Sequence, residues 1–283
     1  MKAFFTILLA MAASCAFAQV NGNTATGLYT SNQAFTSSAT AYTHATTAAA
    51  SEDEVFRKNI LKINLSSLAF HNYSLSYERS LTRKITFVAG YRFMPETNLG
   101  SLRLTEKVSN ALDEPDITDD LSKITTSNNT YTGEFRFYGG RHPGARGLYL
   151  SLYGRYTNID FDYAYDYTTS GKTYLLPFKG TATGYAGGVM LGAQWLIAKR
   201  ITFDWYIIGG HAGKLKVDAP ATADLSSMTA AEKSALQDEL ESWIEIGDKN
   251  YIEATVTDQG AKAKVDDMLL GIRGLGFCLG IAF

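Results

Sequence analysis

Apolar and polar residues alternate with a period of two along most of the chain beyond residue 56. The last nine residues show the pattern most clearly, because bulky apolar side chains occupy every second position from Leu275 to Phe283 and small residues lie between them. Seven earlier segments alternate in the same way and begin near residues 57, 73, 85, 131, 148, 185 and 201. Strict alternation places apolar side chains on one face of a β-strand. The chain is therefore expected to be all-β, with eight strands.

The connectors between these segments alternate in length. Three are short, such as SLTRK and AKR, whereas long loops are expected over about 94–129, 157–180 and 211–267. Short turns on one rim and long loops on the other are typical of small outer-membrane barrels. We predict an eight-stranded antiparallel up-and-down transmembrane β-barrel with long extracellular loops, one of which contains a short α-helix.

A soluble β-sandwich or a lipocalin-like barrel is the alternative to this fold. In those folds the apolar face points inward and the polar face meets water. Here Gly188, Gly192, Gly276 and Gly280 alternate with large apolar residues, and a solvated surface is rarely so rich in glycine. The pattern favours an apolar face turned toward lipid.

The N-terminal residues have the features of an export signal. Lys2 precedes an apolar run over 4–13, and Ala16-Phe17-Ala18 has the small-x-small form of a cleavage site. We expect a signal peptide over 1–18 that is cleaved after Ala18, although acylation of Cys15 is the alternative. Residues 19–55 are rich in Ser, Thr and Ala and are expected to form a flexible periplasmic leader. The barrel domain is then 56–283, in the bacterial outer membrane.

Composition limits the possible partners. Lys and Arg total 26 against 28 Asp and Glu, so the chain lacks the basic surplus of a nucleic-acid-binding protein. Removal of the signal would leave Cys278 as the sole cysteine, which excludes an internal disulfide.

Charged residues gather on the face that is expected to point into the barrel. An eight-stranded barrel is just wide enough to be filled by side chains, and buried charges are costly unless paired. We predict a packed salt-bridge network in the lumen, with a gated pore as the alternative. Its members are Lys62, Glu78, Arg92, Glu134, Arg136, Arg155 and Asp204.

A helix is expected outside the barrel over about 229–246. Thr229 and Glu232 have the spacing of a capping box. One face of this helix is apolar and is expected either to cover the barrel mouth or to dock a partner. The residues of that face are Leu236, Leu240, Trp243 and Ile244.

Nothing in the sequence indicates a metal site, a cofactor or catalysis. An acidic cluster lacks the order and central glycine of an EF-hand loop, so a solvated loop is expected. It comprises Asp113, Glu114, Asp116, Asp119 and Asp120. His71 and His211 fall near the outer rim, but no nucleophile motif accompanies them. We expect no enzymatic activity; modification of lipid A is the less favoured alternative.

The hairpin YERSLTRKITFVAGYRF and the ending GLGFCLGIAF make residues 57–283 resemble the small outer-membrane barrels of the OmpA and OmpX type. Leu279, Ile281 and Phe283 are similar to the C-terminal signal read by the machinery that inserts such barrels. The resemblance implies contact with outer-membrane lipid and lipopolysaccharide, and with the insertion machinery during biogenesis. It carries no catalytic residues.

Long loops in a compact fold usually have a function. We therefore expect a non-enzymatic barrel that acts, through its extracellular loops, as an interaction or accessory subunit of a larger outer-membrane protein complex. A stand-alone surface barrel or a narrow pore is the alternative.

Overall fold

The computed structural model describes residues 56–102, 120–246 and 249–283. The expected signal peptide, the leader and the acidic residues 113–119 lie outside these ranges. Within them, no helix is long and apolar enough to cross a membrane.

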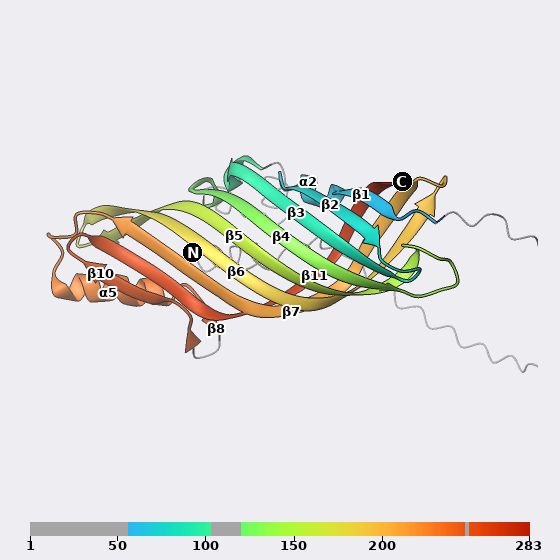
Figure 1. Cartoon of the computed structure of the whole chain (residues 1–283). Helices are drawn as coiled ribbons and strands as arrows, with labels where there is room; N and C mark the ends of the chain where they lie inside the picture. The colour runs from blue at the N-terminus through green and yellow to red at the C-terminus, as the bar shows by residue number, and fades with distance from the viewer. Residues whose placement is uncertain (1–55, 103–119, 247–248) are drawn as a thin grey trace, which may run out of the picture.

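A single antiparallel sheet closes into a ring of eight strands (Figure 1). The ring consists of β1 (Asn59–Asn64), β2 (Tyr73–Ser80), β3 (Ile85–Asn98), β4 (Ile124–Tyr138), β5 (Gly147–Thr169), β6 (Lys172–Ile197), β7 (Ile201–Thr222) and β11 (Gly260–Ala282). The ring closes where β1 pairs with β11, from Ile60 opposite Ala282 to Asn64 opposite Cys278. This confirms the all-β antiparallel barrel that the alternation predicted.

Smaller elements lie outside the eight-stranded ring. They are α2 (Leu65–Leu68), the 3-10 helix η1 (Leu99–Ser101), α5 (Ala230–Glu241), β8 (Glu245–Ile246), β9 (Lys249–Asn250) and β10 (Glu253–Thr257). β10 pairs with the start of β11, at the end of the barrel that also carries α5 (Figure 1). We call this end the outer end, and the opposite end, where β1 meets β11, the closed end.

An apolar belt surrounds the half of the barrel near the closed end. Its side chains point outward and are exposed, while the residues between them are buried inside. The belt includes Leu61, Ile63, Leu75, Tyr91, Tyr131, Phe135, Leu150, Tyr156, Tyr185, Leu191, Ile208, Leu270, Ile272 and Ile281. In this half, the outside of the barrel is more apolar than the inside.

The polarity of the two faces reverses partway along the long strands. On β5 the outward residues change from Tyr156 in the belt to the exposed Asp160 and Asp162, while the inward residues change to the buried Ile159 and Phe161. The outer half of the barrel is therefore apolar inside and polar outside, like a soluble barrel.

All three expected long loops are too long. The loop expected over 94–129 is shortened at both ends, because β3 continues to Asn98 and β4 begins at Ile124. The other two are wrong because of this reversal. Residues 157–169 and 172–180 form a paired hairpin, joined at Ser170 and Gly171, whose φ values of 48° and 75° suit a tight two-residue turn. Likewise β7 continues to Thr222 and β11 begins at Gly260, so the connector between them is shorter than 211–267. Alternation continues through these strands, but its apolar side changes from outward to inward.

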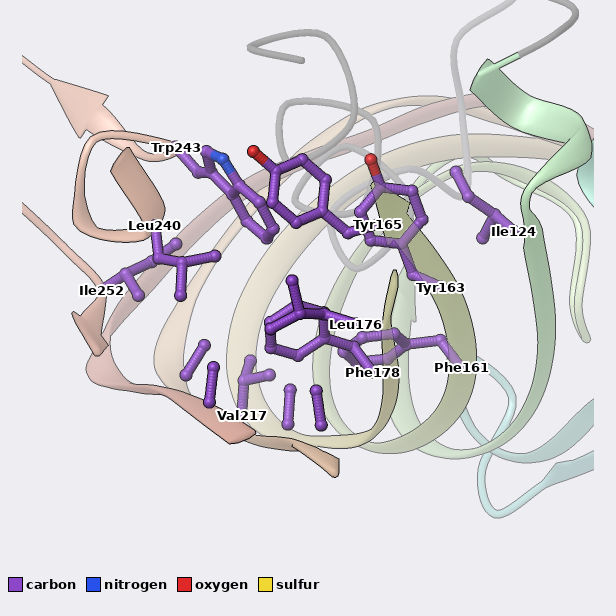
Figure 2. Close-up of a cluster of buried hydrophobic side chains, with 14 of the residues drawn as sticks. Ile124, Phe161, Tyr163, Tyr165, Leu176, Phe178, Val217, Leu240, Trp243 and Ile252 are labelled. Carbon is purple, nitrogen blue, oxygen red and sulfur yellow. The ribbon is translucent and has the colours of Figure 1, made fainter. Parts of the chain in front are cut away.

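An apolar core fills the outer end (Figure 2). Strands β5, β6 and β7 contribute inward residues to it, and α5 with the residues after it covers the mouth. The side chains labelled in Figure 2 are Ile124, Phe161, Tyr163, Tyr165, Leu176, Phe178, Val217, Leu240, Trp243 and Ile252.

Candidate functional site

A network of buried charges crosses the barrel interior within the belt. Lys62 on β1 bonds Glu78 on β2 at 2.6 Å and Asp204 on β7 at 2.7 Å. Arg136 on β4 bonds Asp204 at 2.7 Å and Glu134 at 2.8 Å. Four strands are thus held together across the lumen by ion pairs.

Neutral side chains complete the hydrogen bonding of this network. The hydroxyls of Thr86 and Tyr138 donate to Glu78 at 2.6 and 2.8 Å. Tyr149 donates to Asp204 at 2.8 Å, and Gln194 accepts from Lys62 at 3.0 Å. The carboxylates are therefore surrounded by donors, which is the condition under which buried charges are tolerated.

Arg273 on β11 joins the network, although sequence reasoning did not find it. Its Nη1 donates to Glu134 at 2.7 Å, and its guanidinium lies 4.9 Å from the ring centre of Tyr153 and 4.8 Å from that of Tyr206. Leu275 has a φ of 54°, and the alternation of β11 shifts by one residue there. Because of this shift, counting back from the C-terminal stretch assigns Arg273 to the wrong face.

The structure places all seven expected lumen residues inside the barrel, but it does not bring them all together. Lys62, Glu78, Glu134, Arg136 and Asp204 form the network. Arg92 and Arg155 are buried beside it. Within the described ranges, neither guanidinium has an ion-pair or hydrogen-bond partner, and both Nε atoms are unsatisfied.

The helix α5 closes the outer mouth of the barrel. It begins at the expected capping box, in which Thr229 accepts from the backbone of Glu232 and Glu232 accepts from the backbone of Thr229. It ends at Glu241, so the expected helix over 229–246 is too long. The chain turns after Glu241, and the next residues enter the core.

The four apolar residues expected on one helix face are all buried. Leu236 and Leu240 face the core from α5, and Trp243 and Ile244 follow from the segment after it. The indole of Trp243 packs edge-on against Tyr165, with ring centres 5.0 Å apart (Figure 2). Of the two placements considered, the helix covers its own barrel mouth, so these side chains are not an exposed docking face in this conformation.

Acidic residues of α5 fasten the helix to the rim. Glu232 accepts from Ser170 in the β5–β6 turn at 2.5 Å, and Glu239 accepts from Tyr165 at 2.5 Å. The hydrogen bonds from Ser170 and Thr229 lower the pKa of Glu232 to about 2. Burial, followed by the bond to Glu239, raises the pKa of the Tyr165 phenol. These carboxylates therefore act as anchors.

One segment of β11 has a strand neighbour on only one side. β7 pairs with it at every residue except Leu275, but pairing with β1 stops at Cys278 and pairing with β10 stops at Lys264. Ser66 of α2 accepts from the backbone of Phe277 at 2.9 Å, and beyond it no described residue bonds the free side of 269–276. We call residues 269–276 the open edge. Its outward side chains, such as Leu270 and Ile272, belong to the apolar belt.

The two candidate histidines belong to different elements, His211 to β7 and His71 to the turn before β2. His211 is buried, with its Nδ1 2.9 Å from the hydroxyl of Tyr153. His71 is exposed in the turn between α2 and β2, with a φ of 53°. In the described part of the chain, no group of three or more His, Cys, Asp or Glu side chains could hold a metal ion.

The C-terminal residues Leu279, Ile281 and Phe283 point outward and are exposed. Phe283 also exchanges two backbone hydrogen bonds with Asn59, at 2.9 and 3.2 Å. These residues therefore lie at the seam where the ring closes.

Comparison of the sequence with models of known protein families and with curated proteins finds no match.

Proposed function

We propose that this protein is a non-enzymatic barrel of the bacterial outer membrane that serves as an interaction subunit of a larger outer-membrane protein complex. The open edge of β11 carries this proposal. The likeness to OmpA-type and OmpX-type barrels is one of architecture, and export by a cleaved signal peptide is part of the same proposal.

The reversal of polarity along the strands supports insertion in a membrane. Outward apolar side chains are concentrated in the belt, which gives way to Asp and Lys on β5, β7 and β11. A membrane barrel needs an outward apolar band about 25 Å tall. Strands that continue past such a band would hold the outer end above the lipid and lipopolysaccharide, where a partner could reach it.

The filled interior argues against a pore as the main function. Two small cavities lie along the lumen between the charge network and the apolar core, with about 20 and 10 Å³ free to the centre of a water-sized sphere. Each holds little more than one water molecule. Conduction would require the network or the cap to move.

The open edge favours a protein partner. Unpaired backbone groups in lipid cost several kcal/mol each, so membrane barrels normally have no edge. Here the edge coincides with belt residues such as Leu270 and Ile272. In a membrane, water could not satisfy an edge at the depth of the belt. An added strand or extended segment from another protein would satisfy these groups by β-augmentation.

Site-specific photo-crosslinking in intact outer membranes tests this proposal. A photoreactive amino acid at Ile272 lies beside the open edge, and the matched control at Val189 lies on β6, which has strand neighbours on both sides. Both side chains are exposed in the belt. We expect one discrete protein adduct from position 272 and none from position 189.

The same complex should survive gentle detergent extraction at fixed stoichiometry. Crosslinking to lipid alone at both positions, together with a monomeric barrel after extraction, would reject the interaction function. Conductance and lipid-modification assays would then distinguish the remaining alternatives.

A further inference from the structure

The buried charges of the barrel do not balance. In the described ranges, five buried lysines and arginines face three buried carboxylates. Lys62, Arg136 and Arg273 are paired with Glu78, Glu134 and Asp204. Two positive charges remain, on Arg92 and Arg155.

These two arginines share one cavity with Arg273. They are 7% and 8% exposed, and the cavity that they line leaves about 20 Å³ free to the centre of a water-sized sphere. Further polar groups in the wall are Asn64, Ser74, Ser76, Thr132 and the carboxylate of Glu134. Guanidinium groups from β3, β5 and β11 thus meet across a space large enough for one small guest.

Glu134, the carboxylate that lines the same cavity, has little capacity left for these arginines. One of its oxygens accepts from Nε and Nη2 of Arg136, at 3.0 and 2.8 Å, and the other accepts from Arg273 at 2.7 Å. Its charge is already used within the network, where three carboxylates balance Lys62, Arg136 and Arg273.

An unpaired buried charge is strongly unfavourable, and two like charges beside a third are more so. Water in the cavity would satisfy N–H donors but would leave the excess charge of Arg92 and Arg155 in place. An anion would satisfy the donors and remove half or more of the excess. Arginine remains charged at any ordinary pH, so deprotonation offers no relief.

We propose that Arg92, Arg155 and Arg273 form a binding site for one small inorganic anion of halide size inside the barrel. The small free volume favours a halide over a larger oxyanion or an anion that carries an organic tail. Bound there, the anion ties β3, β5 and β11 together beside the charge network. This site does not depend on the proposed interaction function.

Bromide is the probe for the experiment. Crystals of the full chain in detergent, grown with sodium bromide, should show an anomalous bromine peak between Arg92 and Arg155. In solution, the unfolding temperature in sodium bromide should exceed that in sodium gluconate of equal ionic strength, and the difference should saturate as bromide is raised.

Arg155→Gln should weaken the apparent affinity for bromide at least tenfold. The matched control is Arg79→Gln on the outside of β2, where Arg79 is exposed and donates to Asn59; it should leave the bromide effect unchanged. Arg92→Gln provides a second lumen variant if Arg155→Gln does not fold. Absence of the bromine peak, a bromide effect that does not saturate, or equal weakening by Arg79→Gln would overturn the site.

Discussion

Asp204 occupies the centre of the buried network, and removing its charge tests whether the network holds the barrel together. It bonds Lys62 and Arg136 at 2.7 Å each and accepts from Tyr149 at 2.8 Å. Asp204→Asn keeps the size of the side chain but leaves the three network cations with two carboxylates. The expected result is a large loss of stability with little change of shape.

The magnitude follows from the distances. Two opposite charges 2.7 Å apart attract by about 6 kcal/mol at an effective dielectric constant of about 20, and Asp204 has two such partners. Glu78 bonds the same Nζ of Lys62, so its nearest oxygen lies within about 5 Å of Asp204 and offsets about 3 kcal/mol by repulsion. Burial of the carboxylate offsets several kcal/mol more. About 3–5 kcal/mol remains, the usual loss when one partner of a buried ion pair is removed.

Urea unfolding of the barrel refolded in detergent, followed by tryptophan fluorescence, measures this loss. Asp204→Asn should lower the free energy of unfolding by about 3–5 kcal/mol. Lys62→Met should also destabilise, but the double variant restores charge balance and should cost about 2 kcal/mol less than the two single losses added together. A loss below about 1 kcal/mol for Asp204→Asn, or strict additivity, would refute the account of the network given above.

Three further predictions concern other parts of the barrel. Gly192→Ala should lower the free energy of unfolding by about 1–3 kcal/mol, since the new Cβ would lie 2.3 Å from Tyr149. The control is Gly154→Ala, whose Cβ would have no atom within 4 Å, and it should leave the urea midpoint unchanged. The stabilisation from ionised Glu232 is complete above its ordinary pKa of 4.5 and is lost as pH falls through about 2. Hydrogen exchange in α5 should therefore accelerate as the pH falls across that window. Glu232→Gln should abolish this acceleration. Leu240→Ala removes a fully buried side chain and should weaken the seating of α5 by about 2–5 kcal/mol, seen as faster proteolysis at α5 while the ring stays folded.

The closed-end half of the fold could be predicted from sequence because one rule governs it. With apolar residues outward and small or charged residues inward, Leu150 and Arg136 are each assigned to the correct face by counting. The outer half obeys the opposite rule. Phe161 and Phe178 continue the alternation but point inward, so a search for outward apolar rows reads their segments as loops. Whether a strand segment lies within the belt or beyond it depends on its position along the barrel axis. A local sequence pattern does not contain that information.

The candidate site was predictable to a similar extent. Charged residues on the inward face indicated a lumen network, and the capping box located the start of α5. The sequence could not indicate which arginines find carboxylates, because that depends on the stagger of strands around the ring. Arg136 and Arg155 lie on neighbouring strands, yet one forms ion pairs with three carboxylates and the other with none within the described ranges.

A single irregularity connects the charge network with the open edge. Tyr206 and Ile208 pair with consecutive residues of β6, so β7 has a bulge between them, and β11 shifts at the same height. The backbones of β7 and β11 lie so close together here that β11 requires a glycine. A Cβ at Gly274 would lie 2.6 Å from the carbonyl oxygen of Ile207. Without the shift, Arg273 would face outward among the belt residues and Glu134 would lose a partner. The left-handed backbone that accompanies it costs on the order of 1–3 kcal/mol, and the ion pair that it creates at 2.7 Å offsets that strain. The bulge therefore keeps the belt apolar along the open edge while directing a positive charge into the lumen.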